Sequence, residues 1–161
     1  MEKLTNLVGY IYKALNYKAY LMKLKSRARY AVMALADIAK ENSSKAVPLR
    51  DISLRQGISI NYLEQLFFHL KKNNLVISSR GKAGGYFLSK DPSEIKLLNI
   101  VKAVNDEVKT TRCNKKSKNG CTGKTMKCIT HNLWDELENH INIFFNSKSL
   151  KSILELEKKT K

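Results

Sequence analysis

The strongest constraint on the fold of this chain is an apolar helix face followed directly by a glycine-rich hairpin pattern. Four residues take the i, i+3, i+4, i+7 spacing of one helix face: Leu63, Leu66, Phe67 and Leu70. We predict a helix through Asn73, with Ser59 as its N-cap. Residues 75–79 and 86–88 then predict two strands around a glycine-rich connector. The chain must therefore bury one helix face beside a small hairpin.

Two further helices are predicted upstream of this one. Within residues 26–40, one helix face carries four apolar residues: Ala31, Ala34, Leu35 and Ile38. Pro48 and Leu49 open a short second helix, which stops at Gln56 and Gly57. Two short helices joined by a glycine turn, the second beginning with polar residues, indicate a helix-turn-helix.

The hairpin is interpreted as a wing. Glycine removes side-chain bulk from its tip, so the backbone can approach a phosphate, and Arg80 and Lys82 supply positive charge. The Gly-Lys pair at residues 81–82 does not indicate a nucleotide-binding loop, because the upstream glycine spacing and the following Ser or Thr are missing. The expected fold is mainly helical with a small β-hairpin.

The outward face of the third helix carries the candidate DNA-binding residues. Asn61 and Gln65 can hydrogen-bond to base edges, although an exposed amide side chain is more often only solvated. Tyr62 can contact phosphate or lie partly buried at the helix start, and we weigh these equally. Glu64 repels phosphate but can accept from a cytosine amino group; simple surface is the alternative. Phe68 can touch a thymine methyl group, but we expect it to pack against a neighbouring helix.

Composition favours a nucleic-acid partner. The 161 residues carry a formal net charge of +16, which points to an anionic partner, and no transmembrane or basic amphipathic stretch indicates a membrane. The hydrophobic fraction of 43% argues against disorder. No secretory signal is evident, and three cysteines cannot all pair. We therefore expect a cytoplasmic protein with reduced thiols.

All three cysteines of the chain fall in one polar, lysine-rich loop together with a histidine. Cys113, Cys121, Cys128 and His131 form the pattern C-x7-C-x6-C-x2-H, and this concentration of soft ligands predicts a metal site. Zinc accepts such a donor set, but structural zinc sites usually contain a C-x2-C or C-x4-C knuckle, which is missing here. A metal-free thiol switch is the third and weakest alternative. No constellation typical of an enzyme accompanies the cysteines.

The residues after the wing predict further helices. Leu97, Ile100, Val101 and Val104 indicate a packed helix. Beyond the cysteine loop, four residues recur close to the 3.5-residue period of paired helices: Trp134, Leu137, Ile141 and Phe144. Such a stripe can pack within one chain, but a small winged domain offers it no obvious partner, so we predict a homodimer. A last short helix is expected over residues 150–157.

Residues 22–156 resemble the winged-helix family of bacterial iron–sulfur cluster regulators. The shared stretches are Ser26-Arg27-Ala28-Arg29-Tyr30-Ala31, Asp51-Ile52-Ser53, Gln56-Gly57-Ile58-Ser59, Tyr62-Leu63-Glu64-Gln65-Leu66-Phe67, Arg80-Gly81 with Gly84-Gly85-Tyr86, and Cys128-Ile129-Thr130-His131. The resemblance implies a transcription factor that binds double-stranded DNA and senses iron–sulfur status. It also implies control of cluster assembly genes and cluster donor proteins as partners.

The resemblance also implies roles for individual residues. The three cysteines and His131 would bind a 2Fe-2S cluster, in place of the less favoured zinc. Asn61, Tyr62 and Gln65 match recognition-helix positions, Glu64 the residue that governs promoter choice, and Arg80 the wing arginine that enters the minor groove.

Three departures from the family pattern stand out. The intervals between the cysteines are longer than usual, Lys82 and Ala83 replace small wing residues, and Asn61 stands where serine is common. No ligand is lost. His131 separates the chain from nitric-oxide-sensing relatives, which keep the cysteines without this histidine.

The chemistry of the donor set fits a sensor. Three thiolates and a neutral imidazole leave the oxidised cluster at a charge of about −1, against about −2 with four thiolates. The surrounding lysines favour thiolate forms, and the histidine makes the cluster easier to lose.

These expectations divide the chain into segments. They are an N-terminal extension (1–21, with the true start expected at Met22), a winged helix-turn-helix DNA-binding domain (22–92), a packing helix and connector (93–109), a cluster-binding loop (110–131), dimerisation and C-terminal helices (129–157) and a basic tail (158–161). The alternative function is a zinc-stabilised basic nucleic-acid-binding protein without cluster sensing.

Overall fold

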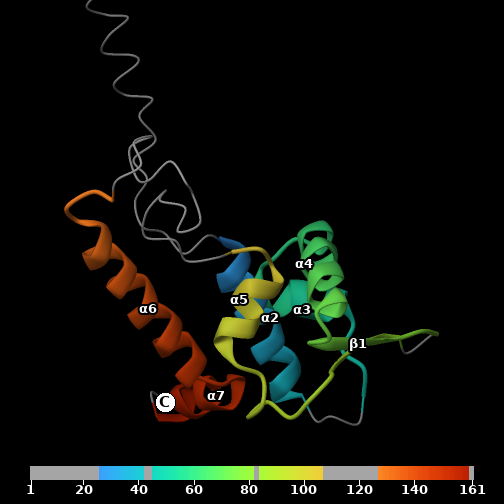
Figure 1. Ribbon diagram of the computed structural model, residues 1–161. Helices are drawn as coiled ribbons and strands as arrows, with labels where there is room; N and C mark the ends of the chain where they lie inside the picture. Colours follow the sequence, from blue (N-terminus) through green and yellow to red (C-terminus); the bar gives the residue numbers. More distant parts are fainter. Residues whose placement is uncertain (1–25, 42–44, 82–83, 107–126, 160–161) are drawn as a thin grey trace, which may run out of the picture.

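The computed structural model describes residues 26–41, 45–81, 84–106 and 127–159 (Figure 1). Their elements, in chain order, are α2 Ser26–Lys40, α3 Leu49–Gln56, α4 Ile60–Lys72, β1 Val76–Ser79, β2 Gly85–Leu88, α5 Leu97–Ala103, α6 His131–Ser147 and α7 Leu150–Lys159. This mainly helical chain with one antiparallel hairpin confirms the predicted fold class. The N-terminal extension, Cys113, Cys121 and Lys82 lie outside the described residues.

The core is built on α2 and α4. The predicted inner face of α4 is correct, because Leu63, Leu66, Phe67 and Leu70 are all at most 1% exposed. On α2 the buried face is rich in alanine, including Ala28, Ala31 and Ala34, and small side chains allow neighbouring helices to approach closely. The apolar face of α5 completes the core with Ile100 and Val101.

The turn between α3 and α4 has the predicted glycine. Gly57 adopts the left-handed conformation with φ 64°, and its N–H donates to the carbonyl of Ser53 at 2.9 Å. Ser59 occupies the N-cap position of α4, but its side chain makes no capping hydrogen bond. The main chain closes this end, since the Ser59 carbonyl accepts from the N–H groups of Tyr62 and Leu63 at 3.1 and 3.0 Å.

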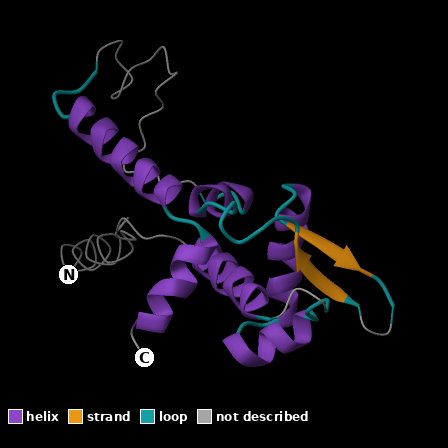
Figure 2. Ribbon diagram, turned by 90° about the horizontal axis from the view of Figure 1, so that it is seen from below, coloured by secondary structure: helices purple, strands orange, loops and turns teal. Residues whose placement is uncertain are grey.

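The hairpin is fixed to the domain by backbone and by aromatic contacts. Val47, just before α3, exchanges two hydrogen bonds of 2.9 Å with Tyr86 of β2. The Tyr86 ring meets the buried ring of Phe67 with 4.6 Å between centroids. Figures 1 and 2 show the hairpin projecting from the side of the body that carries α3 and α4.

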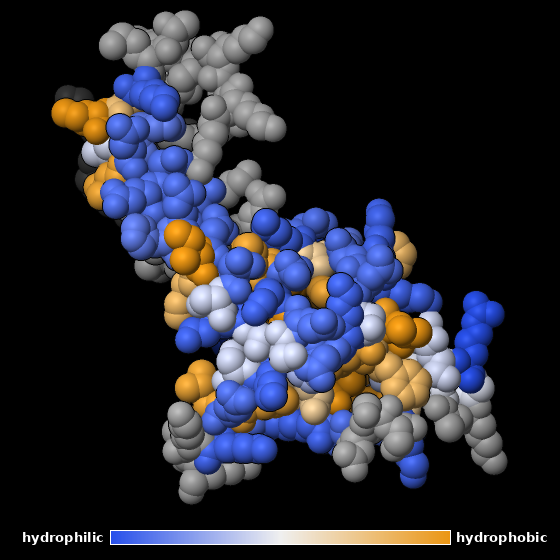
Figure 3. Space-filling view, turned by 60° about the horizontal axis from the view of Figure 1, so that its bottom comes forward, coloured by the Kyte–Doolittle hydropathy of each residue, from blue (hydrophilic) through white to orange (hydrophobic). Residues whose placement is uncertain are grey.

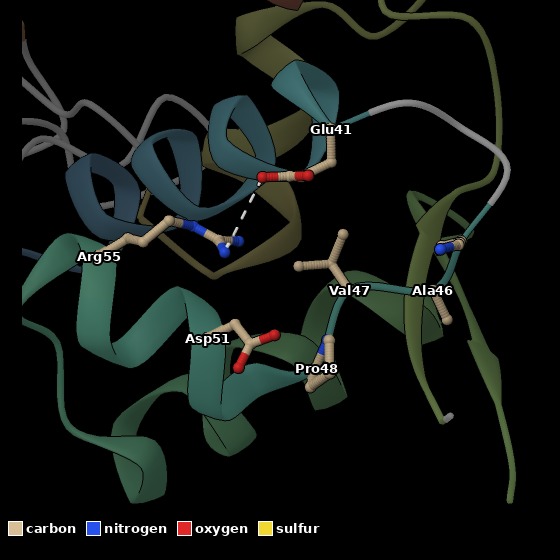
Figure 4. A pocket seen from close by; sticks show the side chains of 7 residues that line it. Glu41, Ala46, Val47, Pro48, Asp51 and Arg55 are labelled. Atoms are coloured by element: carbon tan, nitrogen blue, oxygen red, sulfur yellow. Dashed lines mark ion pairs between the residues drawn. The ribbon is translucent and has the colours of Figure 1, made fainter. Parts of the chain in front are cut away.

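A buried carboxylate joins α2 to α3. Asp37, 5% exposed, accepts from Arg55 at 2.7 Å and from Gln56 at 2.8 Å. The hydrogen bond that Arg55 donates to Asp37 raises the pKa of the Arg55 guanidinium above its ordinary value. Figure 4 shows the same guanidinium paired with Glu41, 3.9 Å away, over a hollow that Val47 and other residues line.

The C-terminal helices differ in how they meet this body. Leu150, the first residue of α7, is fully buried, and Lys40 of α2 pairs with Glu157 at 2.7 Å. The last helix extends to Lys159, two residues beyond the predicted end. In contrast, none of the residues of α6 is buried, and the helix reaches away from the body on the side opposite the hairpin (Figures 1 and 2). Among the described residues, no helix has the length and apolar content of a membrane span.

Candidate functional site

The recognition helix α4 presents its predicted polar residues to solvent. Asn61, Glu64 and Gln65 are all exposed on the face opposite the buried apolar stripe. Within the described residues, none of these three side chains forms a hydrogen bond that would occupy it. The face is therefore available for contacts with base edges.

Tyr62 lies partly buried at the helix start, which is one of the two positions that the sequence left open. It is half-buried, and the edge of its ring meets the ring of Tyr30 at 5.8 Å with an interplanar angle of 88°. The guanidinium of Arg29 lies over the Tyr30 ring, 5.0 Å from its centroid. Packing thus holds the Tyr62 ring at the start of α4, next to Tyr30, whose ring also contacts the Arg29 guanidinium.

Phe68 does not lie as expected. Its side chain is 65% exposed, so the prediction that it packs against a neighbouring helix is wrong for this chain by itself. The Phe68 ring contacts the ring of the next residue, His69, with 5.5 Å between the two centroids. An apolar ring therefore stands on the exposed face of α4.

The wing is held in a defined position relative to α4. Lys71, in the last turn of the helix, donates to the hydroxyl of Ser78 in β1 at 2.6 Å. Arg80 follows β1 and is exposed. Its partner in the prediction, Lys82, lies outside the described residues. Arg80 thus follows directly after a strand that is hydrogen-bonded to the recognition helix.

Two of the four predicted metal ligands are described, and both lie at the N-terminus of α6. The N–H of His131, the first residue of the helix, donates to the carbonyl of Cys128 at 3.0 Å. Both side chains are half-buried, and the Cys128 sulfur lies 3.6 Å from the hydroxyl of Thr130. The positive end of a helix dipole favours a thiolate. Within the described ranges, no group of three or more Cys, His, Asp and Glu side chains gathers to hold a metal.

The predicted dimerisation stripe is visible on α6. Trp134 is 39% and Phe144 55% exposed, and Leu137 and Ile141 are half-buried. Further apolar exposure comes from Leu133 and Ile143. On the face shown in Figure 3, apolar side chains lie among hydrophilic ones along α6, the helix that reaches away from the body.

Comparisons with known proteins identify the family. The model of the Rrf2 family, described as an iron-dependent transcriptional regulator, matches residues 24–156. The chain belongs to the Rrf2 family. A helix-turn-helix with an attached hairpin is the part of such a regulator that contacts DNA.

Rrf2 relatives cover most of the chain. It is 48% identical over 133 residues to the HTH-type transcriptional regulator IscR of Serratia proteamaculans, a match that covers 83% of this chain and 79% of that protein. The IscR of Cronobacter sakazakii is 49% identical over 129 residues, covering 80% and 78%. The structure of T. potens IscR superposes with a TM-score of 0.70 at 29% identity, covering 86% of this chain and 90% of that one.

These findings establish the chain as an IscR-like, DNA-binding transcriptional regulator of the Rrf2 family. It is not an enzyme. A likeness in fold extends to CymR, the global cysteine regulator of B. subtilis, with a TM-score of 0.67 at 22% identity.

One buried carboxylate at the start of α2, that of Asp106, was not predicted from the sequence. Asp106 is 3% exposed, and its carboxylate accepts from the N–H of Ala28 at 3.0 Å, in the first turn of α2. A carboxylate at this end of a helix satisfies an otherwise unpaired N–H and complements the dipole. Asp106 is the last residue of the described range 84–106, shortly before the predicted cluster loop. At the other end of this contact, Tyr30 lies about one turn into α2 and its ring contacts that of Tyr62 in α4. No local pattern signals a contact across 78 positions.

Proposed function

We propose that this protein is a homodimeric regulator that senses iron–sulfur supply through a 2Fe-2S cluster and controls genes for cluster assembly. The observation that carries the proposal is an identity of 48–49% with IscR regulators over most of the chain. The Rrf2 family match over residues 24–156 spans the proposed ligands Cys128 and His131. The proposal places it in the cytoplasm, with cluster donor proteins as partners.

The proposed cluster ligands are Cys113, Cys121, Cys128 and His131. Thiolate and imidazole donors suit iron–sulfur chemistry, and the helix terminus at Cys128 supports the deprotonated thiol. When bound, the cluster would report its own availability, because its loss changes the charge and geometry of this donor set. In this proposal the four ligand residues only bind and release the cluster, and no substrate is converted at the site.

The proposed dimer is formed through α6. The predicted dimerisation residues are Trp134, Leu137, Ile141 and Phe144; Trp134 is 39% and Phe144 55% exposed, and Leu133 beside them is 59% exposed. Their burial against a second copy of the helix would remove a large apolar area from water. Because the proposed ligands Cys128 and His131 lie at the start of the same helix, cluster occupancy and dimer geometry share one element.

The cluster proposal is tested by anaerobic purification from iron-replete cells. We expect a coloured protein with iron and acid-labile sulfide in equal amounts, and size-exclusion chromatography with light scattering should give a dimer. A colourless protein that contains zinc alone would contradict cluster sensing and favour the zinc-stabilised alternative. Competition between promoter duplex and structured RNA separates the two functions, since sequence-selective duplex binding belongs to the regulator.

The wing contact gives a separate prediction. Arg80→Ala should weaken promoter binding about tenfold and reduce the dependence of affinity on salt, because one cation that meets the DNA is lost. Fluorescence anisotropy at several salt concentrations measures both quantities. Lys158→Ala is the matched control, since this exposed lysine lies on α7, and it should leave both unchanged. Equal effects of the two substitutions would refute a specific role for Arg80.

A further inference from the structure

The residue that the proposed function leaves unused on the recognition helix is Phe68. A single exposed apolar side chain is ordinary on a protein surface. Phe68 differs through its location, because it is 65% exposed on the helix that a winged helix-turn-helix places in the major groove. We propose that Phe68 is a specificity-determining residue that contacts the C5-methyl group of a thymine. This inference rests on the proposed DNA-binding function.

Helix geometry places Phe68 among the predicted base-reading residues. At 3.6 residues per turn, its direction lies about 20° from that of Asn61 and between those of Glu64 and Gln65. All of these residues are exposed, as is Lys72 one turn further on. Asn61, Glu64, Gln65 and Phe68 therefore have the spacing i, i+3, i+4, i+7. Other recognition helices contact bases from one face with this spacing. Phe68 is the fourth member of this set.

The chemistry of a phenyl ring selects its partner in the groove. The ring cannot form the strong hydrogen bonds that amide and carboxylate side chains make with base edges, and it carries no charge for a phosphate. The apolar group that the major groove offers is the methyl of thymine, since the other base edges present donors and acceptors. Contact with this methyl removes apolar surface of both partners from water.

The ring is also held ready for such a contact. Its centroid lies 5.5 Å from that of His69, and the two planes meet at 81°. This edge-to-face arrangement is a favourable one for aromatic rings. A phenylalanine has only two side-chain torsions, so little conformational entropy is lost when it meets the base.

The position of the ring argues for DNA rather than for a second protein copy. Helix α6, whose apolar stripe we assign to the dimer, lies on the opposite side of the body from α4 (Figures 1 and 2). On its own helix Phe68 is flanked by exposed polar residues, with Glu64 and Gln65 one turn before it and Lys71 and Lys72 one turn after it. A polar surface with lysines at one end, around a single apolar ring, suits a base edge in a groove lined by phosphates better than it suits an apolar protein face.

The test is a methyl-deletion scan on a duplex selected from a random pool with the complete, cluster-loaded protein. Each thymine is replaced in turn by deoxyuridine, which keeps base pairing and removes only the methyl group. For the parent protein, we expect one replacement in the half-site to lower affinity about fourfold, the factor for one buried methyl group. Phe68→Ala should bind the unmodified duplex more weakly and lose this dependence, so that its two affinities agree to within about 1.5-fold.

A matched control and the outcomes that would overturn the proposal complete the test. Leu54→Ala, at a 76% exposed leucine of α3, is the matched control and should keep the methyl dependence of the parent. Selective binding with no effect of any methyl, or an unchanged methyl effect in Phe68→Ala, overturns the role of Phe68 and leaves the proposed regulator intact. A shift of Phe68→Ala from dimer to monomer, measured by light scattering, overturns it in favour of a protein contact. Failure of the folded parent to select any duplex overturns the proposed function itself.

Discussion

A Cys128→Ser variant purified without oxygen is expected to be colourless, with iron and sulfide reduced at least about tenfold relative to the parent. Serine keeps the size of the side chain but replaces a soft, readily ionised thiol by a hydroxyl that stays protonated near neutral pH. The half-buried position of Cys128 at the start of α6 makes a substitute ligand from solvent a poor replacement. Absorption spectra with iron and sulfide analysis give the answer directly.

Histidine variants on the same helix sharpen this test. His131→Ala should retain less cluster than the parent, because one of the four proposed donors is lost. His140→Ala is its control: this exposed histidine lies further along α6, with Nδ1 2.9 Å from the carbonyl oxygen of Glu136, and it should retain the parent's cluster. Circular dichroism should show that all of these variants remain helical. Full iron and sulfide in Cys128→Ser, or an equal loss in both histidine variants, would remove these residues from the ligand set.

The sequence predicted those parts of the fold that have a local signal. The inner face of α4 follows from the spacing of Leu63, Leu66, Phe67 and Leu70, and the turn before it from Gly57, because helix periodicity and left-handed backbone are properties of adjacent residues. The contacts of Asp106 with Ala28 and of Val47 with Tyr86 join distant segments. They depend on how the elements pack, which no short pattern encodes.

Phe68 shows a different limit. Its place on the outward face of α4 was predicted correctly, but its packing was not. A pattern of apolar residues indicates which ones gain by leaving water; it does not say whether the covering surface belongs to the same chain. The α6 stripe has the same ambiguity. In the candidate site, the short spacing of Cys128 and His131 predicted that these two residues lie close together. The hydrogen bond between Asp106 and Ala28 could be found only in the three-dimensional structure.

The second large effect is expected at Gly85, where the wing meets the segment before α3. A Cβ atom at this position would lie 2.5 Å from the carbonyl carbon of Val47, 2.6 Å from its oxygen and 2.8 Å from the nitrogen of Pro48. These are backbone atoms, so relief requires that the strand or the Val47 segment shift. Gly85→Ala should therefore lower the free energy of unfolding by about 2–3 kcal/mol, as overpacking of a tight interior does.

The same shift should impair DNA binding. Moving β2 weakens the paired hydrogen bonds between Val47 and Tyr86 and the contact of Tyr86 with Phe67, which together orient the wing against α4. We expect promoter affinity to fall by at least about tenfold, because Arg80 and α4 can no longer contact the duplex together. Chemical denaturation and fluorescence anisotropy on the same preparation separate lost stability from lost orientation.

Gly57→Ala is the matched control for this prediction. Gly57 has φ 64°, so alanine there is strained by about 1 kcal/mol, but its Cβ would meet no atom within 4 Å. Gly57→Ala should therefore lower the free energy of unfolding only through the backbone conformation of this turn. The wing should keep its position. The order of the two variants is the decisive result: Gly85→Ala should be the less stable and the weaker in DNA binding. The reverse order would show that the wing tolerates a side chain against Val47, and that its orientation is set elsewhere.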